Sequence, residues 1–488
     1  MALERSSFAF LLRLAHPAMA NLMPASLFGN GLGLILLFVA ISTMTFDLYL
    51  QSSRPNCSCN DQGNAALLGT NKVGRLTLQD ILPRDQDAGR EFRGYGCAAH
   101  VYVELGAYRV GNRSFAVVGL ASKPLHTFGS PSFGCSWIAI NAQNSSVEGR
   151  ASVYYTDYHY GRVYKVVSVI CAFEVDIGTD GNGGQLILDA FVGDTFGTKE
   201  RIVALTEKPG DYKWSNFAPP YRYEFLYCGS PLYGDINPKR IREWLAYHGL
   251  VFGPRSHFVF YDAGGINDAV REVLNPWIKL GRVTVENVRQ QSQYDGYYYN
   301  QFLIVADCLH RTRFLANWTF FFDIDEYIYF EPPKTIHDVF ARYSDSAQVL
   351  FTQYRISDKF CAIENNSASS KWAMEKLAYH IVTSQNVDVK MALNPRKVTS
   401  AGVHWAIAYD GPDDRCDASV GRYYHYHNTV TTKGEVCREF LDHKQRWNIS
   451  DGEDTLIYDG SMIPFAEKAK QLEQELFTAT DPAALLET

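Results

Sequence analysis

Residues 318–330 read Trp-Thr-Phe-Phe-Phe-Asp-Ile-Asp-Glu-Tyr-Ile-Tyr-Phe, an aromatic run that three acids interrupt. Such an apolar run is typical of a strand buried on both faces of a sheet. Because side chains alternate along a strand, we expect Asp323 and Asp325 to point to the same side. Paired carboxylates at the carboxyl end of a strand suit Mg²⁺ or Mn²⁺ that holds a diphosphate. Asp-x-Asp is common by chance, however, and a solvated acidic strand end explains the triplet equally well.

The sequence on both sides of this stretch predicts further elements. Strands are predicted at Tyr223–Tyr227, His257–Asp262, Arg282–Val288 and Gln348–Arg355. Helices are predicted at about 237–249, 270–277, 298–316, 335–343, 435–447 and 464–477. Asn237 and Pro238 are typical of a helix start, and Gly249 of a helix end. Because strands and helices alternate before the acidic pair, we expect βαβ crossovers and a mostly parallel α/β sheet over residues 221–488, with the pair ending its fourth strand.

Residues 94–215 have a different pattern. Short alternating or β-branched runs recur there between Gly, Asn, Ser and Pro clusters, without helical periodicity, which predicts an all-β sandwich. The region contains Trp137 and a group of tyrosines, namely Tyr154, Tyr155, Tyr158, Tyr160 and Tyr164. Aromatic faces stack on sugar rings, so a carbohydrate-binding module is one interpretation. Ordinary strand residues of high β-propensity explain these tyrosines as well.

The N-terminal region predicts a membrane anchor. No Asp, Glu, Lys or Arg occurs between Leu14 and Phe46. We predict a cytosolic tail at 1–30, a transmembrane helix at 31–50 and a stem at 51–93. Arg5 and Arg13 precede the apolar segment, which favours a single-pass type II orientation with the rest of the chain in the lumen. A cleaved signal peptide is the alternative.

The cysteines indicate the compartment in which the chain folds, and the net charge indicates which partners are not expected. All ten cysteines follow the apolar segment, and their even number fits disulfides in an oxidising lumen, although the sequence does not give their pairing. The formal net charge is −7 and no long basic run occurs. Nucleic acid is therefore not an expected partner.

Several motifs around the acidic pair follow one another in a recognisable order. They are Glu243-Trp-Leu-Ala-Tyr-His248, His257-Phe-Val-Phe-Tyr-Asp262, Gln301 with Asp307-Cys308-Leu309 and Arg311, the stretch 318–327, Asn394-Pro-Arg-Lys-Val398, Gly402-Val-His404 and Tyr424-His-Tyr426. This order and spacing resembles the family-92 glycosyltransferases over residues 223–447. With the segments in front, the chain is similar to the plant members that synthesise β-1,4-galactan. One departure is that the family's usual His-Tyr-Arg is His425-Tyr426-His427 here.

The resemblance implies a GT-A fold, a Golgi location and an inverting transfer. Galactose would move from UDP-α-galactose to the non-reducing end of β-1,4-galactan in the rhamnogalacturonan I side chains of pectin. Mn²⁺ would be held by Asp323 and Asp325, with His425 first and His427 second as the imidazole ligand. His404 is a weaker third candidate.

The resemblance also suggests residues for the donor and for the proton transfer. Asp262 and Asp323 would contact the nucleotide sugar, and Arg396 and Lys397 would neutralise phosphate charge, although a solvated turn explains this basic pair as well. The expected catalytic base is Glu375, since it lies between the acids and the late histidines. Asp454 is the alternative base.

Other classes of function remain open at this stage. A glycan-binding scaffold without catalysis would keep the β region, and a transferase for another UDP-sugar would keep the acids. A haloacid-dehalogenase phosphatase also uses Asp-x-Asp but normally has Thr or Val where this chain has Tyr327. The sequence does not decide between a monomer and a homodimer.

Overall fold

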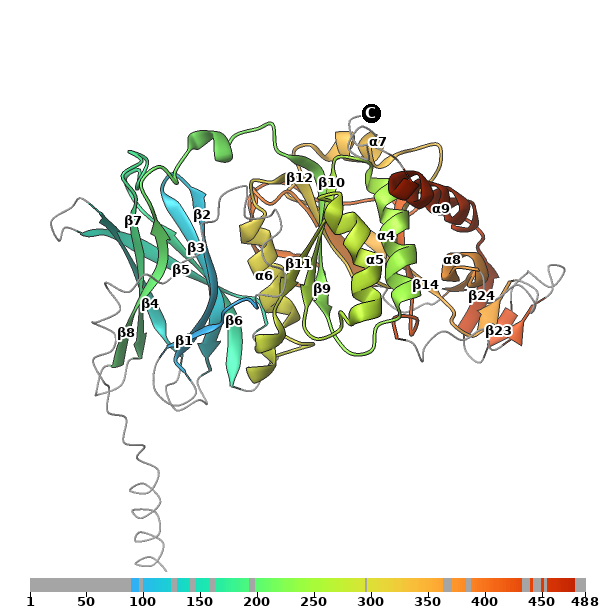
Figure 1. Ribbon diagram of the computed structural model, residues 1–488, viewed down its shortest axis with the longest axis horizontal. Helices are drawn as coiled ribbons and strands as arrows, with labels where there is room; N and C mark the ends of the chain where they lie inside the picture. The colour runs from blue at the N-terminus through green and yellow to red at the C-terminus, as the bar shows by residue number, and fades with distance from the viewer. Residues whose placement is uncertain are drawn as a thin grey trace, which may run out of the picture. The chain divides into compact units, whose positions relative to one another are not determined.

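The computed structural model describes residues 89–95, 100–123, 130–140, 146–157, 163–192, 198–294, 296–362, 371–382, 388–431, 439–441, 449–451 and 454–478 (Figure 1). All of them belong to the second of two compact units, residues 72–488. The predicted tail and anchor and most of the stem lie outside the described residues. Within the described ranges, no helix is long and apolar enough to cross a membrane.

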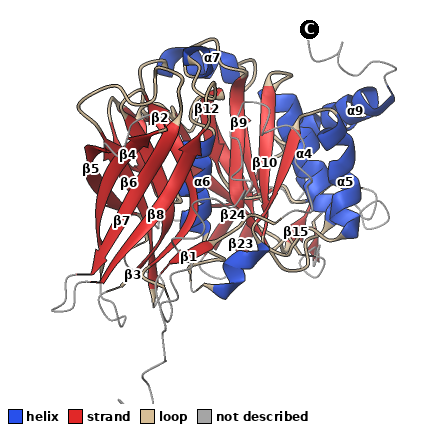
Figure 2. Cartoon of the chain, turned by 60° about the vertical axis from the view of Figure 1, so that its left-hand side comes forward, coloured by secondary structure: helices blue, strands red, loops and turns tan. Residues whose placement is uncertain are grey.

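The first part of this unit is an eight-stranded antiparallel sheet in the order β1-β2-β3-β6-β5-β4-β7-β8 (Figures 1 and 2). Its strands are β1 (Arg93–Tyr95), β2 (Tyr102–Gly111), β3 (Ser114–Ser122), β4 (Ser132–Ala139), β5 (Ser146–Tyr155), β6 (Tyr164–Ala172), β7 (Gly184–Val192) and β8 (Thr198–Glu207). A disulfide joins Cys135 in β4 to Cys171 in β6, although these strands are not hydrogen-bonded neighbours. The sheet therefore folds over on itself in the manner of a sandwich.

Two of the aromatic residues proposed for a glycan-binding surface lie in cores instead. Trp137 is buried and stacks on Phe115, with 5.3 Å between the ring centroids. Tyr164 is also buried and packs edge-on against Tyr294. These two rings are not available to a sugar.

The second part contains a twelve-stranded sheet in the order β11-β10-β9-β12-β17-β14-β16-β24-β23, with β13, β20 and β21 attached beside this path. Its strands are β9 (Tyr223–Leu232), β10 (Ser256–Asp262), β11 (Val283–Asn287), β12 (Ala316–Phe321), β13 (Glu326–Phe330), β14 (Gln348–Ile356), β16 (Tyr379–Val382), β17 (Val389–Leu393), β20 (Asp413–Arg415), β21 (Gly421–Tyr426), β23 (Ile449–Asp451) and β24 (Asp454–Tyr458). Two small sheets pair β15 (Phe360–Cys361) with β22 (Glu439–Phe440) and β18 (Val398–Ala401) with β19 (Ala406–Tyr409).

The prediction of a mostly parallel GT-A-type sheet is wrong. Strands β11, β10, β9 and β12 are parallel. From β12 through β17, β14, β16 and β24 to β23, every neighbouring pair is antiparallel, so the sheet is mixed. Parallel neighbours need long crossovers, usually helices. Among the described residues between β12 and β24, the helices are the short α7 (Ile336–Phe340), the 3-10 turn η6 (Ala341–Tyr343) and α8 (Ala373–Lys376), and none of them is long enough to cover a sheet face.

The longer helices are α4 (Pro238–Phe252), α5 (Asp268–Lys279), α6 (Gln301–Arg311) and α9 (Ile463–Thr478). Asn237 caps α4 as predicted, because its side chain accepts a hydrogen bond from the backbone of Lys239 at 3.0 Å. The helix continues past Gly249, which packs so closely against Trp277 that a Cβ would lie 2.7 Å from the ring. It ends at Gly253, where φ is +74°. The helix predicted at 435–447 falls largely outside the described residues.

The parallel strands are buried on both faces, as the apolar runs predict. Phe225 and Tyr227 of β9 join a core with α4, α5 and α9, whereas Leu226 and Cys228 face the opposite way. The second core lies under α6 and also contains side chains of the sandwich, including Val118. The two sheets therefore share apolar contacts within one compact unit.

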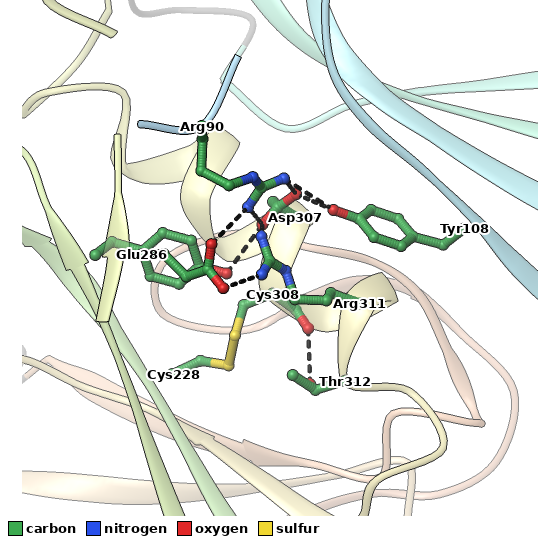
Figure 3. The surroundings of a disulfide bond; sticks show 9 residues. Arg90, Tyr108, Cys228, Glu286, Asp307, Cys308, Arg311 and Thr312 are labelled. Atoms are coloured by element: carbon green, nitrogen blue, oxygen red, sulfur yellow. Dashed lines mark hydrogen bonds and ion pairs between the residues drawn. A yellow bond between two sulfur atoms is a disulfide. The ribbon is translucent and has the colours of Figure 1, made fainter. Parts of the chain in front are cut away.

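A buried polar cluster reinforces this contact (Figure 3). Asp307 of α6 accepts hydrogen bonds from both terminal nitrogens of Arg90 at 2.9 Å and from Arg311 at 3.0 Å. Tyr108 of β2 donates to the same carboxylate, and Tyr261 of β10 does so at 2.9 Å. At the next residue in sequence, a disulfide joins Cys308 to Cys228 of β9. We call Arg90, Tyr108, Tyr261, Asp307 and Arg311 the Asp307 cluster.

Candidate active site

Asp323 and Asp325 lie in the turn between two strands and not on a strand, which corrects the expectation for 318–330. β12 ends at Phe321, and β13 begins at Glu326 and pairs antiparallel with β21. The Glu326 backbone donates to the Asp323 carbonyl at 3.1 Å, and the Glu326 carboxylate accepts from the Asp323 backbone at 2.7 Å. These reciprocal bonds fix the turn. The period-two argument for Asp323 and Asp325 therefore does not apply.

The turn does lie at the predicted edge of the sheet. Because β9, β10 and β12 are parallel neighbours, their carboxyl ends meet at one edge. Ser230 lies near the end of β9 and Asp262 ends β10, while Asp323 follows β12. Polar side chains from three strands are thus placed along the edge where ligands of parallel sheets bind.

Asp323 is held by three neighbours. The Lys390 ammonium donates to its carboxylate at 2.8 Å, and Ser230 and Gln301 also donate to it, the latter at 3.4 Å. Burial opposes the charge of Asp323, but Lys390 and Ser230 outweigh burial and lower the pKa of the carboxyl to about 2. Asp323 is therefore ionised, and most of its hydrogen-bonding capacity is in use.

Lys390 connects two of the acids. Its side chain is only 4% exposed and lies 3.2 Å from Glu326 as well as 2.8 Å from Asp323. Although burial opposes its charge, these carboxylates raise the pKa of Lys390. Burial raises the pKa of Glu326 to about 7 despite the ammonium. One ammonium thus faces two acids, Asp323 and Glu326, and Asp325 lies between them in the sequence.

Two histidines lie beside these acids: His425 is in β21, and His427 follows the end of that strand. The antiparallel register places His425 opposite Glu326. His425 Nε2 lies 3.4 Å from Asp325 Oδ2, and its Nδ1 lies 2.8 Å from the amide of Gln353. The imidazole of His427 stacks on that of His425, with 3.6 Å between centroids. Burial, together with His425, lowers the pKa of His427 to about 4, so His427 is neutral near pH 7.

The predicted manganese ligands fit such an ion in part. Within the described residues, no three His, Cys, Asp or Glu side chains are grouped so that they could hold a metal. Asp325 and His425 nevertheless present a carboxylate oxygen and a ring nitrogen 3.4 Å apart, which suits two neighbouring ligands of one Mn²⁺. Metal ions in phosphate-transferring sites commonly use one or two protein ligands plus substrate oxygens and water. Asp323 is already engaged by Lys390, so it fits less well as a direct ligand.

Comparison with known proteins decides the family. The model of glycosyltransferase family 92 matches residues 223–462. The chain is 43% identical to galactan beta-1,4-galactosyltransferase GALS1 of Arabidopsis thaliana over 399 residues, which is 81% of this chain and 80% of that protein. The chain belongs to glycosyltransferase family 92. The family-92 chain is also 44% identical to galactan beta-1,4-galactosyltransferase GALS2 of Arabidopsis thaliana, over 72% of its own length and 70% of that protein.

A more distant relative is similar to this family-92 glycosyltransferase over a shorter stretch of sequence. Beta-1,4-galactosyltransferase galt-1 of Caenorhabditis elegans is 25% identical over 189 residues, 38% of this chain and 43% of that protein. The resemblance seen in the motifs is therefore confirmed, and the chain is a glycosyltransferase.

The first family motif supports the acidic turn from behind. In α4, Trp244 donates its indole N–H to the Glu326 carbonyl at 2.9 Å, and Tyr247 donates to the Ile328 carbonyl at 2.8 Å. His248 accepts from the Ile328 backbone at 3.3 Å. These bonds attach β13 to α4. The motif in this glycosyltransferase thus positions the turn through buried side chains.

Arg396 and Lys397 lie at the opposite end of the sheet from the turn. Arg396 donates to the Asn317 carbonyl at 2.7 Å and also to Ala316, at the start of β12. Lys397 donates to the Asp345 carbonyl at 2.5 Å. At roughly 3.3 Å per strand residue, Asn317 lies about 20 Å from Asp323. The structure therefore does not bring this basic pair together with the acids.

Asp262 shares the edge of the turn but has local partners. One carboxylate oxygen accepts from the backbones of Gly264 and Ile266 at 2.8 and 3.2 Å, and the other accepts from Arg289 at 3.0 Å. Arg289 is 54% exposed, whereas the Asp262 side chain is 2% exposed, so the carboxylate is buried among these partners. Asp262 shapes the loop after β10.

The two candidate bases occupy other places. Glu375 accepts from the Trp372 backbone at 2.8 Å, from Lys470 of α9 at 2.8 Å and from Lys371 at 3.1 Å. Burial opposes its charge, but Lys470 and these other donors outweigh burial and lower the pKa of Glu375. Its carboxylate is thus occupied in joining α8 to α9. Asp454 begins β24, opposite Asp451 in the β23–β24 hairpin.

Lys390, Gln353 and Ser230 were not recognised from the sequence. The run Val-Lys-Met-Ala-Leu at 389–393 has the pattern of a buried strand with one lysine inside it. A buried lysine needs an acidic partner, and this requirement was a usable signal. Gln353 and Ser230 have no comparable signal, since their roles depend on strand pairings distant in sequence.

Proposed function

We propose that this family-92 chain is a galactan β-1,4-galactosyltransferase that transfers galactose from UDP-galactose to the non-reducing end of β-1,4-galactan with inversion. The names of the similar Arabidopsis proteins support the galactan acceptor and the linkage. The observation that carries the proposal is the pairing of Asp325 with His425, 3.4 Å apart, beside the Asp323–Lys390 ion pair. This group lies where a parallel sheet binds a nucleotide.

Each side chain of the turn has a distinct part in the proposal. Asp325 and His425 would hold Mn²⁺, which when bound would neutralise the charge that develops on the departing diphosphate. The amide nitrogen of Gln353 donates to Nδ1 of His425, so Nε2 carries the ring proton toward Asp325 and would have to lose it before it could bind a metal. Lys390 keeps Asp323 ionised and oriented at the edge of the site. We keep Glu375 and Asp454 as the candidates for the base that accepts the proton of the acceptor hydroxyl.

An assay of the purified fragment 89–488 against a panel of UDP-sugars and β-1,4-galactan oligomers, with and without Mn²⁺, tests this function. We expect transfer from UDP-galactose, with loss of at least a hundredfold in Asp325→Asn and His425→Gln. Asp176→Asn is the matched control, because Asp176 forms an exposed surface ion pair with Arg113. Galactan binding without any transfer would instead identify a scaffold, and transfer from another UDP-sugar would refute the donor.

We propose further that the described unit works in the Golgi lumen. The disulfides Cys135–Cys171 and Cys228–Cys308 support an oxidising compartment. In sealed microsomes, we expect an epitope at the C-terminus to be protected from protease until detergent is added. Digestion without detergent would contradict a lumenal location.

A further inference from the structure

The small sheet β18–β19 presents an apolar face to solvent next to the acidic turn. Trp405 immediately before β19, and Ile407 and Tyr409 within it, are 55%, 43% and 38% exposed. Ala406 between them is buried, as alternation along a strand requires. Three large exposed apolar side chains in one row are unusual on a protein surface and indicate a binding surface. We call Trp405, Ile407 and Tyr409 the β19 row.

One end of the β19 row is fixed beside the site. His404 Nδ1 lies 2.8 Å from the carbonyl of Val389, the residue before Lys390. Lys390 in turn bonds Asp323 at 2.8 Å. Trp405, whose ring centroid lies 6.0 Å from that of His404, is therefore close to the acidic turn.

The other end of the row lies along the sheet, away from the turn. Tyr409 at this end pairs with Val398 of β18, the residue after Lys397, and Lys397 lies at the opposite end of the sheet from the turn. Beyond Tyr409, Asp410 donates to the Lys397 carbonyl at 2.8 Å. From Trp405 to Tyr409 the row spans about 13 Å at the rise of a strand. It thus begins at the site and extends outward in a line.

We propose that the β19 row is the platform for the part of the β-1,4-galactan acceptor that lies behind its reacting end. This inference rests on the proposed function and adds the residues that bind the acceptor chain. Galactopyranose rings have an apolar C–H face that stacks on aromatic side chains, and a linear row suits a linear glycan. Trp405 lies under the sugar units nearest the turn, and Tyr409 lies under units farther from it.

The test compares acceptors of different length in three variants. We expect KM for β-1,4-galactan hexamer to rise roughly tenfold in Trp405→Ala and in Tyr409→Ala. For the dimer, Trp405→Ala still raises KM, whereas Tyr409→Ala leaves it within about twofold of wild type, because a short acceptor does not extend to Tyr409. Trp214→Ala is the matched control, since Trp214 is 59% exposed but lies in the connection after β8.

The outcomes separate this inference from the proposed function. If wild type and Trp214→Ala transfer galactose and the two β19 variants keep the wild-type dependence on acceptor length, the platform is refuted while the function stands. If wild type transfers nothing to galactan, both are refuted. If light scattering shows that Tyr409→Ala dissociates a dimer of wild type, the row is a contact between two copies and the platform is again refuted.

Discussion

At the acidic turn, one buried ammonium balances two carboxylates. Lys390 contacts Asp323 and Glu326, and both acids are also bonded to backbone or side-chain donors of the turn and its neighbours. A protein with a buried ion pair is little more stable than a variant in which both partners are replaced by apolar residues. Removal of one partner alone is costly, because it leaves a buried charge unpaired. The arrangement therefore depends on Lys390 more than on any single acid.

Replacement of Lys390 by Met tests this dependence. We expect Lys390→Met to lower the free energy of unfolding by about 3 kcal/mol, because Glu326 and Asp323 lose their counterion. Urea denaturation measures the change. The double variant Lys390→Met with Glu326→Gln should recover part of the loss, since the uncharged amide that replaces this carboxylate needs no counterion. Equal stability of Lys390→Met and wild type would contradict the buried pairing.

A second prediction at this scale concerns a buried histidine and pH. His257 bonds the Gly281 carbonyl at 3.0 Å and Thr284 at 2.9 Å, and burial lowers its pKa to about 3. An unfolded histidine has a pKa of about 6.5, so protons taken up below pH 6.5 stabilise only the unfolded chain. The stability that His257 contributes is present above pH 6.5 and falls as the pH drops toward 3.

The difference between wild type and His257→Gln isolates this effect from other titrating groups. We expect the destabilisation caused by His257→Gln to be about 2 kcal/mol smaller at pH 5 than at pH 8. Wild type loses about 1.4 kcal/mol of stability for each pH unit below 6.5 through His257, and the variant does not. Denaturant titrations at the two pH values provide the measurement. A destabilisation that does not change with pH would show that folded His257 is protonated at pH 5.

At the scale of elements, the sequence predicted what depends on local pattern. Helical periodicity and the Asn237 cap located α4, and the apolar runs located β9, β10 and β12. The antiparallel half of the sheet was not predicted, because strand direction there depends on the pairings of β17 with β12 and β14, which are distant in sequence. The end of β12 was also not predicted, because apolar and aromatic residues occur on both sides of the turn and no Gly or Pro lies between β12 and β13.

The candidate site shows the same division. Asp323, Asp325 and His425 were found from motifs, and the structure brings them to one edge through the β13–β21 register. Arg396 was assigned from a motif as well, yet the antiparallel path of β17 takes the chain to the opposite edge of the sheet. A motif identifies residues, whereas the direction of the strands decides which of them meet.

The contacts of Glu375 predict an effect on stability at this scale. Glu375→Gln removes the charge that faces Lys470 and Lys371, which join α8 to α9. We expect a loss of about 1–2 kcal/mol in the free energy of unfolding, and a complete loss of transfer only if Glu375 is also the base. Asp454→Asn is the comparison. If Glu375→Gln is as stable as wild type and binds UDP-galactose but transfers nothing, Glu375 is the base that its place in the sequence suggests.

At the scale of the whole described unit, the sandwich and the mixed sheet share one core. Tyr108 and Val118 of the sandwich pack in the same apolar group as Leu303 of α6 and Leu226 of β9. The Asp307 cluster lies at this contact and is also formed by both parts (Figure 3). Shared burial of this kind predicts that the two parts unfold together.

Asp307→Asn tests this coupling. The amide cannot balance Arg90 and Arg311, so Glu286 must then serve as the counterion of both buried guanidinium groups. We expect a loss of about 3–5 kcal/mol, as for other buried pairs that lose one partner. Because the apolar core persists, the thermal transition should stay single and move to lower temperature. Hydrogen exchange read separately from peptides of β3 and β12 should then show protection lost in both at the same temperature. Two transitions, with the β3 peptides protected after those of β12 have exchanged, would show instead that the sandwich is an independent domain that merely rests on the catalytic part.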